Sequence, residues 1–125
     1  MATSSTNLNS PISNTHYTDT DIGSGTTATS TTISGSSEVV NHILINNSVN
    51  SSKVYVKLYN DASSPTIGTT EPFMVLPCEA LSSFEIQFLP GITFAQLHYA
   101  AVTTAGESGT TGPGVSGITL EVRFT

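Results

Sequence analysis

Apolar and polar residues alternate along much of the chain after residue 37. The alternation is clearest at residues 118–124, where every second side chain is apolar, and it recurs at residues 53–59 and 83–88. Because successive side chains of a β-strand point to opposite faces, this pattern predicts strands with one face on a core. A near-continuous apolar run at residues 39–45 predicts a buried strand.

Two further stretches complete the predicted set of strands. Residues 93–104 carry apolar side chains on both faces, which predicts a central strand that is covered on both sides. Residues 73–76 form a short strand that ends at Pro77, because proline cannot donate to a central ladder. Pro90 and Gly91 predict a hairpin turn between the two strands that flank them.

These predicted strands, with no window that repeats every 3.6 residues, indicate an all-β fold. We expect residues 38–125 to form one antiparallel β-sandwich or barrel with a jelly-roll or other Greek-key-like arrangement. Alternation does not reveal the order of strands in a sheet, so the choice among these arrangements stays open.

The first 37 residues differ in composition from the rest. Ser and Thr are abundant there, and the apolar residues are too widely spaced to form a core. These are Leu8, Ile12, Tyr17, Ile22 and Ile33. Ordering a residue costs about 1–2 kcal/mol, so residues 1–37 are predicted to be an extended or disordered arm when alone. The arm is either a dispensable tail or, as we favour, a partner-binding segment that adds strands to exposed sheet edges.

Charge and composition narrow the functional classes. Only 10% of residues are charged and the net charge is −6. The cations Lys53, Lys57 and Arg123 are too few to neutralise a run of phosphates, so we expect no direct binding to nucleic acid. No apolar run is long enough to span a membrane and no secretory leader pattern follows Met1, so we expect a protein made in a cytosol, without a membrane partner. Cys78 is alone, which predicts a small buried apolar residue.

Two motifs suggest a ligand site, but their context argues against one. Residues 112–117 fit the G-x-G-x-x-G pattern of dinucleotide sites, yet they lead into a strand instead of a helix, so a surface loop is expected. Asp19, Asp21 and Gly23 have the beginning of a calcium-loop spacing close to His16, without the later glutamate that such a loop requires. We therefore expect neither a cofactor nor a metal site.

Catalytic residues are not expected either. His42 and His98 lie inside predicted strands, where a hydrogen-bonded structural histidine is the usual case. No G-x-S-x-G elbow surrounds any serine. Glu79 and Glu85 are available as a carboxylate pair, but Glu85 belongs to an outward-facing alternation, which is typical of a solubilising charge. The chain is predicted to be non-enzymatic. Its candidate exposed contact face is the outward row of the strand at 53–59, namely Tyr55, Lys57 and Tyr59.

Several short motifs resemble a pattern found in tailed-bacteriophage structural proteins. They are Lys-Leu-Tyr-Asn at 57–60, Pro-Thr-Ile-Gly-Thr at 65–69 with Pro72, Leu-Pro at 76–77, Phe-Leu-Pro-Gly-Ile-Thr-Phe at 88–94 and Tyr-Ala-Ala-Val-Thr-Thr at 99–104. The order and spacing of these motifs carry the resemblance. It covers roughly residues 53–104 and the final alternating strand.

The resemblance implies a virion component of the capsid decoration, or cement, type. Such a protein would bind across subunits of the major capsid protein and stabilise the head, on the capsid surface, after assembly in the host cytoplasm. A homo-oligomer is implied as well, and a closed trimer would fit three-fold capsid positions. The alternative is a neck, tail or fibre-associated protein that touches host-surface glycans through Tyr55, Tyr59 and the Gly-rich loop.

Overall fold

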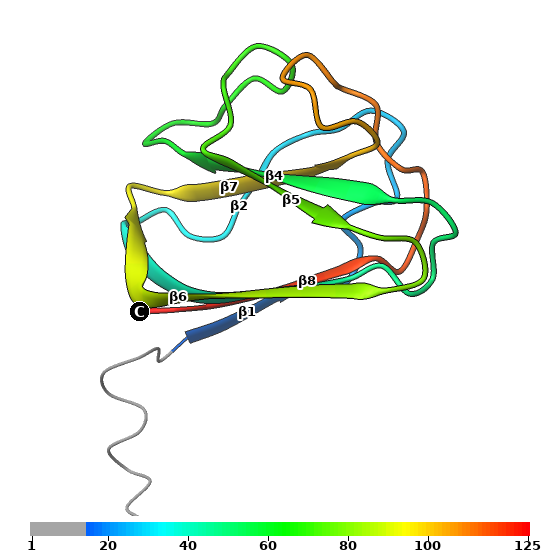
Figure 1. The fold of residues 1–125 in the computed structure, drawn as a ribbon. Helices are drawn as coiled ribbons and strands as arrows, with labels where there is room; N and C mark the ends of the chain where they lie inside the picture. The colour runs from blue at the N-terminus through cyan, green and yellow to red at the C-terminus, as the bar shows by residue number, and fades with distance from the viewer. Residues whose placement is uncertain (1–14) are drawn as a thin grey trace, which may run out of the picture.

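The computed structural model describes residues 15–125, which form two four-stranded sheets without any helix in that range (Figure 1). The strands are β1 (Thr15–Asp19), β2 (Thr31–Thr32), β3 (Glu38–Asn46), β4 (Val54–Asn60), β5 (Met74–Cys78), β6 (Ser83–Phe94), β7 (Leu97–Val102) and β8 (Thr119–Phe124). One sheet has the order β1-β8-β3-β6 and the other β2-β7-β4-β5, and all neighbouring strands are antiparallel. The predicted all-β class and the antiparallel sandwich are confirmed. The described part of the chain offers no helix long and apolar enough to cross a membrane.

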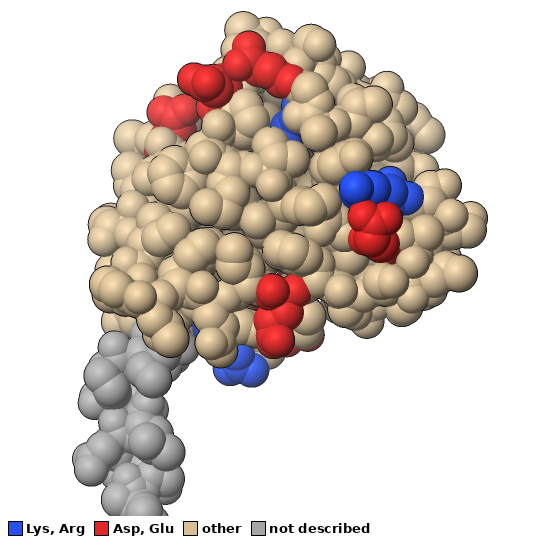
Figure 2. Space-filling view, viewed as in Figure 1, with Lys and Arg blue, Asp and Glu red and all other residues tan. Residues whose placement is uncertain are grey.

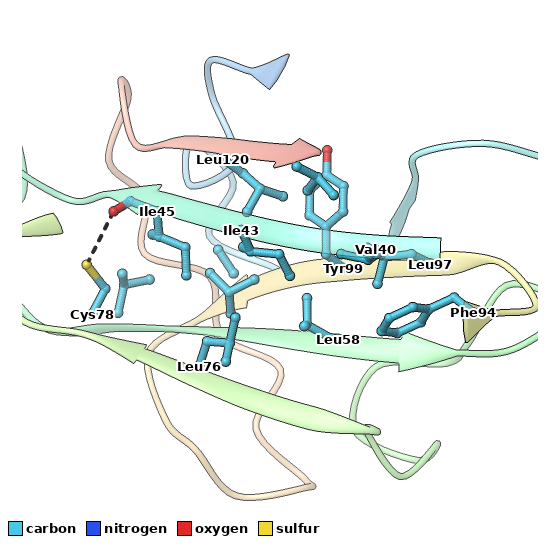
Figure 3. Packing of buried hydrophobic residues seen from close by; sticks show 14 residues of the cluster. Val40, Ile43, Ile45, Leu58, Leu76, Cys78, Phe94, Leu97, Tyr99 and Leu120 are labelled. Carbon is cyan, nitrogen blue, oxygen red and sulfur yellow. Dashed lines mark hydrogen bonds between the residues drawn. The ribbon is translucent and has the colours of Figure 1, made fainter. Parts of the chain in front are cut away.

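Apolar side chains from facing strands fill the space between the two sheets. Ile43 and Ile45 of β3 and Val56 and Leu58 of β4 are all 0% exposed, and Figure 3 shows Ile43 and Leu58 within this layer. Val and Ile have stiff branched side chains that pack well on a pleated surface, so these runs favour strands. Full burial of one such side chain is worth about 1.5–3 kcal/mol. β7 is buried along its whole length between β2 and β4, as predicted for a central strand.

The N-terminal segment belongs to both sheets, so the folded body includes residues from Thr15 onward and does not begin at Glu38. β1 pairs with β8, and β2 pairs with β7. Between these two strands, residues 22–28 are hydrogen-bonded to the backbone of residues 110–118. This segment therefore crosses from one sheet to the other along the end of the sandwich, and the arm adds two strands to the fold.

Composition misplaces this boundary because backbone hydrogen bonds, and not a separate core, hold the segment in place. Tyr17, Ile22 and Ile33 are partly buried and pack against the core of the sandwich. These three side chains therefore contact their own chain, whatever else they bind. Leu8 and Ile12, the other two apolar residues of the predicted arm, lie outside the described residues.

The hairpin predicted at Pro90 and Gly91 is wrong, because β6 continues through both residues beside β3. The register shifts at this point, so that residues 88–91 face the single residue Asn41. A bulge of this kind lets a proline lie within an edge strand. β6 and β7 then lie in different sheets and do not pair.

Glycine is required at position 91 by the close approach of β3. A Cβ atom added to Gly91 would lie 2.6 Å from Cγ1 of Val39 and 2.9 Å from the carbonyl oxygen of Val40. The Pro-Gly pair thus shapes a bulge inside the sheet instead of reversing the chain.

Loops cover one outer face of the sandwich and leave the other open. The loops between β4 and β5 and between β7 and β8 lie over the β2-β7-β4-β5 sheet (Figure 1). Lys57 is buried beneath them and donates from Nζ to the carbonyl oxygens of Glu107 and Gly109, at 3.1 and 3.0 Å. On the β1-β8-β3-β6 sheet, the outward side chains of the described residues are exposed or half-buried.

Candidate interaction face

The contact face predicted on β4 is largely covered, so this prediction is corrected. Lys57 is 0% exposed and Tyr59 is 1% exposed. Tyr55 is half-buried, and the ammonium of Lys53 lies 5.2 Å from the centre of its ring. Alternation along β4 correctly predicts two faces, yet a period of two does not distinguish a face open to water from a face beneath loops.

Burial changes the acid–base properties of the covered residues. It lowers the pKa of the Lys57 ammonium and raises the pKa of the Tyr59 hydroxyl. The Tyr59 hydroxyl is also buried without a hydrogen-bond partner among the described residues. Lys57 therefore acts as an internal tether for the loop at residues 107–109, and not as a surface cation.

The two histidines predicted to be structural are both hydrogen-bonded. His98 is buried, with Nδ1 2.7 Å from Oγ1 of Thr32 and Nε2 3.1 Å from the carbonyl oxygen of Asp61. His42 is bonded to Glu85 on the open side of the molecule. Cys78 is buried as predicted, and burial raises the pKa of its thiol.

A small polar pocket of about 210 Å³ lies beside the crossing segment, with Asp19, Asp21, Thr27 and Tyr99 in its wall. Tyr99 donates to Asp19 at 2.5 Å, and Asp21 accepts from the backbone N–H of Gly117 at 3.2 Å. Both carboxylates of the calcium-like spacing are thus bonded within the fold. Residues 15–125 contain no group of three or more His, Cys, Asp or Glu that could hold a metal ion.

The open side of the sandwich is a sheet face that mixes charged, polar and apolar side chains. We define the open face as the outward side chains of the β1-β8-β3-β6 sheet, which are His16, Thr18, His42, Leu44, Asn46, Glu85, Gln87, Thr119, Glu121 and Arg123. Strand register places Leu44 of β3 directly between Glu85 of β6 and Glu121 of β8. In the neighbouring row, Arg123 lies between His42 and His16.

Two histidine–glutamate pairs join neighbouring strands across this face. Nε2 of His16 lies 2.7 Å from Oε1 of Glu121, and Nε2 of His42 lies 2.7 Å from Oε2 of Glu85. Cross-strand pairs of this kind stabilise a register by about 0.2–1 kcal/mol each. Each carboxylate has a second oxygen that can accept a further hydrogen bond from a ligand.

A cleft of about 490 Å³ opens on this face beside the bulge of β6. Its wall consists of Asn41, His42, Leu44, Glu85, Gln87, Leu89, Glu121 and Arg123. Leu89 projects from the bulge and is 74% exposed. The cleft therefore combines apolar side chains, carboxylates and polar acceptors in one place.

The sequence alone does not predict this site, although the outward positions of three of its charged residues can be read from the alternating pattern. Glu85, Glu121 and Arg123 each occupy an outward position in an alternating strand. Their grouping depends on β3 lying between β6 and β8, and no single-sequence pattern specifies that order.

No protein-family model and no curated protein matches this sequence. A solved structure described as that of the infectious bursal disease virus Gx strain is similar at 11% sequence identity, with a TM-score of 0.33. The match covers 90% of this chain and 37% of that chain, so this chain spans little more than a third of that protein's length. A TM-score this low carries no argument about the function of this chain.

Proposed function

We propose that this chain is a non-enzymatic structural protein of a virus particle, a capsid decoration protein that attaches to subunits of the major capsid protein through the open face. The sequence motifs between residues 57 and 104 that resemble tailed-bacteriophage structural proteins support the viral role. The unequal covering of the two sheets is the structural observation that carries the mode of attachment.

A chain in which only 10% of the residues are charged suits a protein interface. The centres of protein interfaces are depleted of charged residues, and Figure 2 shows that neutral residues form most of the visible surface of this molecule. A capsid lattice holds many copies of one contact close together, so individually weak contacts add up to a large stabilisation. Such a protein needs no reacting groups.

The edge strand β1 offers a second element of attachment. Among the described residues, β1 pairs only with β8, so its other edge can accept a strand from a partner. We propose that the decorating unit is a closed homotrimer at a three-fold position, in which this edge contacts a neighbouring subunit.

Purified particles of the virus that encodes the chain provide the test. The protein is expected in the particles, on the outer surface of the head, and heads that lack it are expected to release their genome at lower temperature. A protein carrying Leu44→Asp on the open face should fail to restore the stability of such heads. Glu107→Gln, on the loop-covered side, is the matched control and should restore it fully. Absence of the protein from purified particles would refute the proposal.

The polar pocket beside the crossing segment favours a second candidate, a neck, tail or fibre-associated protein that binds a host glycan. Its wall of carboxylates and hydroxyls can bond the hydroxyl groups of a sugar. Tyr59, expected to contact a glycan, is buried and has no part in this pocket. Two results together would favour this candidate over decoration. A gold label on this protein should be found at the tail of the particle, and Asp21→Asn should abolish glycan binding.

A further inference from the structure

Two residues in the wall of the cleft on the open face have buried side-chain atoms whose hydrogen-bonding capacity the described chain does not satisfy. Asn41 is 8% exposed, and its Oδ1 atom has no hydrogen-bond donor among residues 15–125. Nδ1 of His42 is also buried and without a partner in the same range. In the tautomer whose Nε2–H donates to Glu85, Nδ1 is an acceptor. A buried acceptor without a donor is costly, so a ligand donor that reaches it from the cleft would offset that cost.

The charges in the cleft indicate a cation. Glu85 and Glu121 flank Leu44 in one row, about 10 Å apart along the sheet because two strand spacings separate them. His16 and His42 pair with these glutamates through hydrogen bonds, and a neutral histidine does not cancel the charge of its carboxylate. Leu44 and the exposed Leu89 supply apolar surface beside the carboxylates.

We propose that the cleft receives an arginine side chain of a partner protein. The aliphatic stem would pack on Leu44 and Leu89, and the guanidinium would donate to the carboxylate of Glu85, while Glu121 on the far side of Leu44 would add attraction at longer range. Arginine fits because its planar head carries five N–H donors in a fixed fork, and this site presents several acceptors around one apolar floor. The identity of the partner as a capsid subunit rests on the proposed function, but the chemistry of the cleft does not.

Arg123 also lines the cleft and opposes an incoming cation. Its neighbours in register are the two histidines, one row away from Leu44. Two substitutions in the cleft should therefore change the affinity for arginine in opposite directions. Removing the negative charge of Glu85 weakens the binding of arginine, and removing the positive charge of Arg123 strengthens it. If only the net charge of the protein mattered, removing a charge on the loop-covered side would change the affinity as much as removing one in the cleft.

The test is an NMR titration of the full chain with N-acetylarginine amide, with N-acetylcitrulline amide as the neutral probe of the same shape. The arginine derivative should shift the side-chain amide signals of Asn41 and the ring signals of His42 in a saturable way, and the citrulline derivative should not. Glu85→Gln should weaken this binding by about threefold, and Arg123→Gln should strengthen it by about the same factor.

Glu107→Gln is the control for net charge and should leave the dissociation constant unchanged. Equal shifts with both probes, shifts confined to other parts of the molecule, or the absence of saturable shifts would overturn the proposal. The titration needs no virus particle. If the protein binds the arginine derivative but is absent from virus particles, only the decoration role is refuted. If the protein decorates particles but does not bind the arginine derivative, only the arginine site is refuted.

Discussion

The hydroxyl oxygens of Tyr17 and Tyr99 lie 2.6 Å apart, and this contact joins β1 of one sheet to β7 of the other. The two rings pack edge to face, with their centres 6.1 Å apart. Tyr99 also donates to Asp19, so a chain of hydrogen bonds ties the N-terminal strand to the core. Burial raises the pKa of Tyr99, which keeps its hydroxyl protonated as a donor.

Tyr17→Phe should lower the free energy of unfolding by about 1 kcal/mol, because it removes one partly buried hydrogen bond. Tyr59→Phe is the matched control, since the hydroxyl of Tyr59 is buried without a partner among the described residues, and its removal should be neutral or stabilising. Urea unfolding measures both. Equal losses in the two variants would contradict the role given to the Tyr17 contact.

Gly91→Ala should destabilise the protein by about 1–3 kcal/mol, because the added methyl group meets β3 with no space to move. Gly106→Ala is the control, since nothing lies within 4 Å of the Cβ position there. Thermal unfolding of the two variants gives the comparison. A similar melting temperature for both would show that the bulge is not tightly packed against β3.

Glu38 gives the protein a pH dependence in the acidic range. Its Oε1 accepts a hydrogen bond from the backbone N–H of Leu97 at 2.5 Å, and burial raises the pKa of Glu38 above its ordinary value. Between the ordinary and the raised pKa, unfolding releases a proton, so stability falls as pH rises through this window. Glu38→Gln should remove that slope in urea unfolding measured across the window. An unchanged slope would exclude Glu38 as its source.

Lys57 should have the opposite effect in the alkaline range. Because burial lowers the pKa of Lys57 in the folded state, unfolding takes up a proton between the lowered and the ordinary pKa. Its contribution to stability therefore rises with pH across that window and is lost as pH falls through the lowered pKa. Lys57→Met should remove this rise and speed amide hydrogen exchange at Gly109, whose loop loses its tether. Unchanged exchange would argue against the tether.

Leu81 has a backbone conformation that is unfavourable for leucine. Its φ angle is 57°, and its side chain is 66% exposed, so little packing offsets the strain. Leu81→Asn should raise the free energy of unfolding by up to about 1 kcal/mol, because asparagine tolerates the left-handed region better. Val49→Asn, at an exposed residue without a positive φ, is the control and should not stabilise.

The sequence predicts the strands well because burial on one face imposes a period of two. β4 and β8 are found where alternation places them, and β7 is central and buried because its residues are apolar on both faces. The prediction fails at Pro90 and Gly91, since the same dipeptide suits both a turn and a bulge. Only the register against Asn41 distinguishes the two.

The site is less predictable than the strands. Lys57 and Tyr59 alternate like exposed residues, and only the path of the loops above them reveals their burial. The cleft requires β3 to lie between β6 and β8, an order that arises from contacts distant in sequence. Residues 22–28 are likewise held by backbone bonds to residues 110–118, which side-chain composition does not encode.

The layer of loops over the β2-β7-β4-β5 sheet makes the two sides of the molecule unlike each other. A copy attached by its bare sheet would turn this layer toward the medium, and Gly106 lies there in open space. A foreign peptide inserted beside Gly106 would then be displayed on the particle exterior without touching the attachment surface.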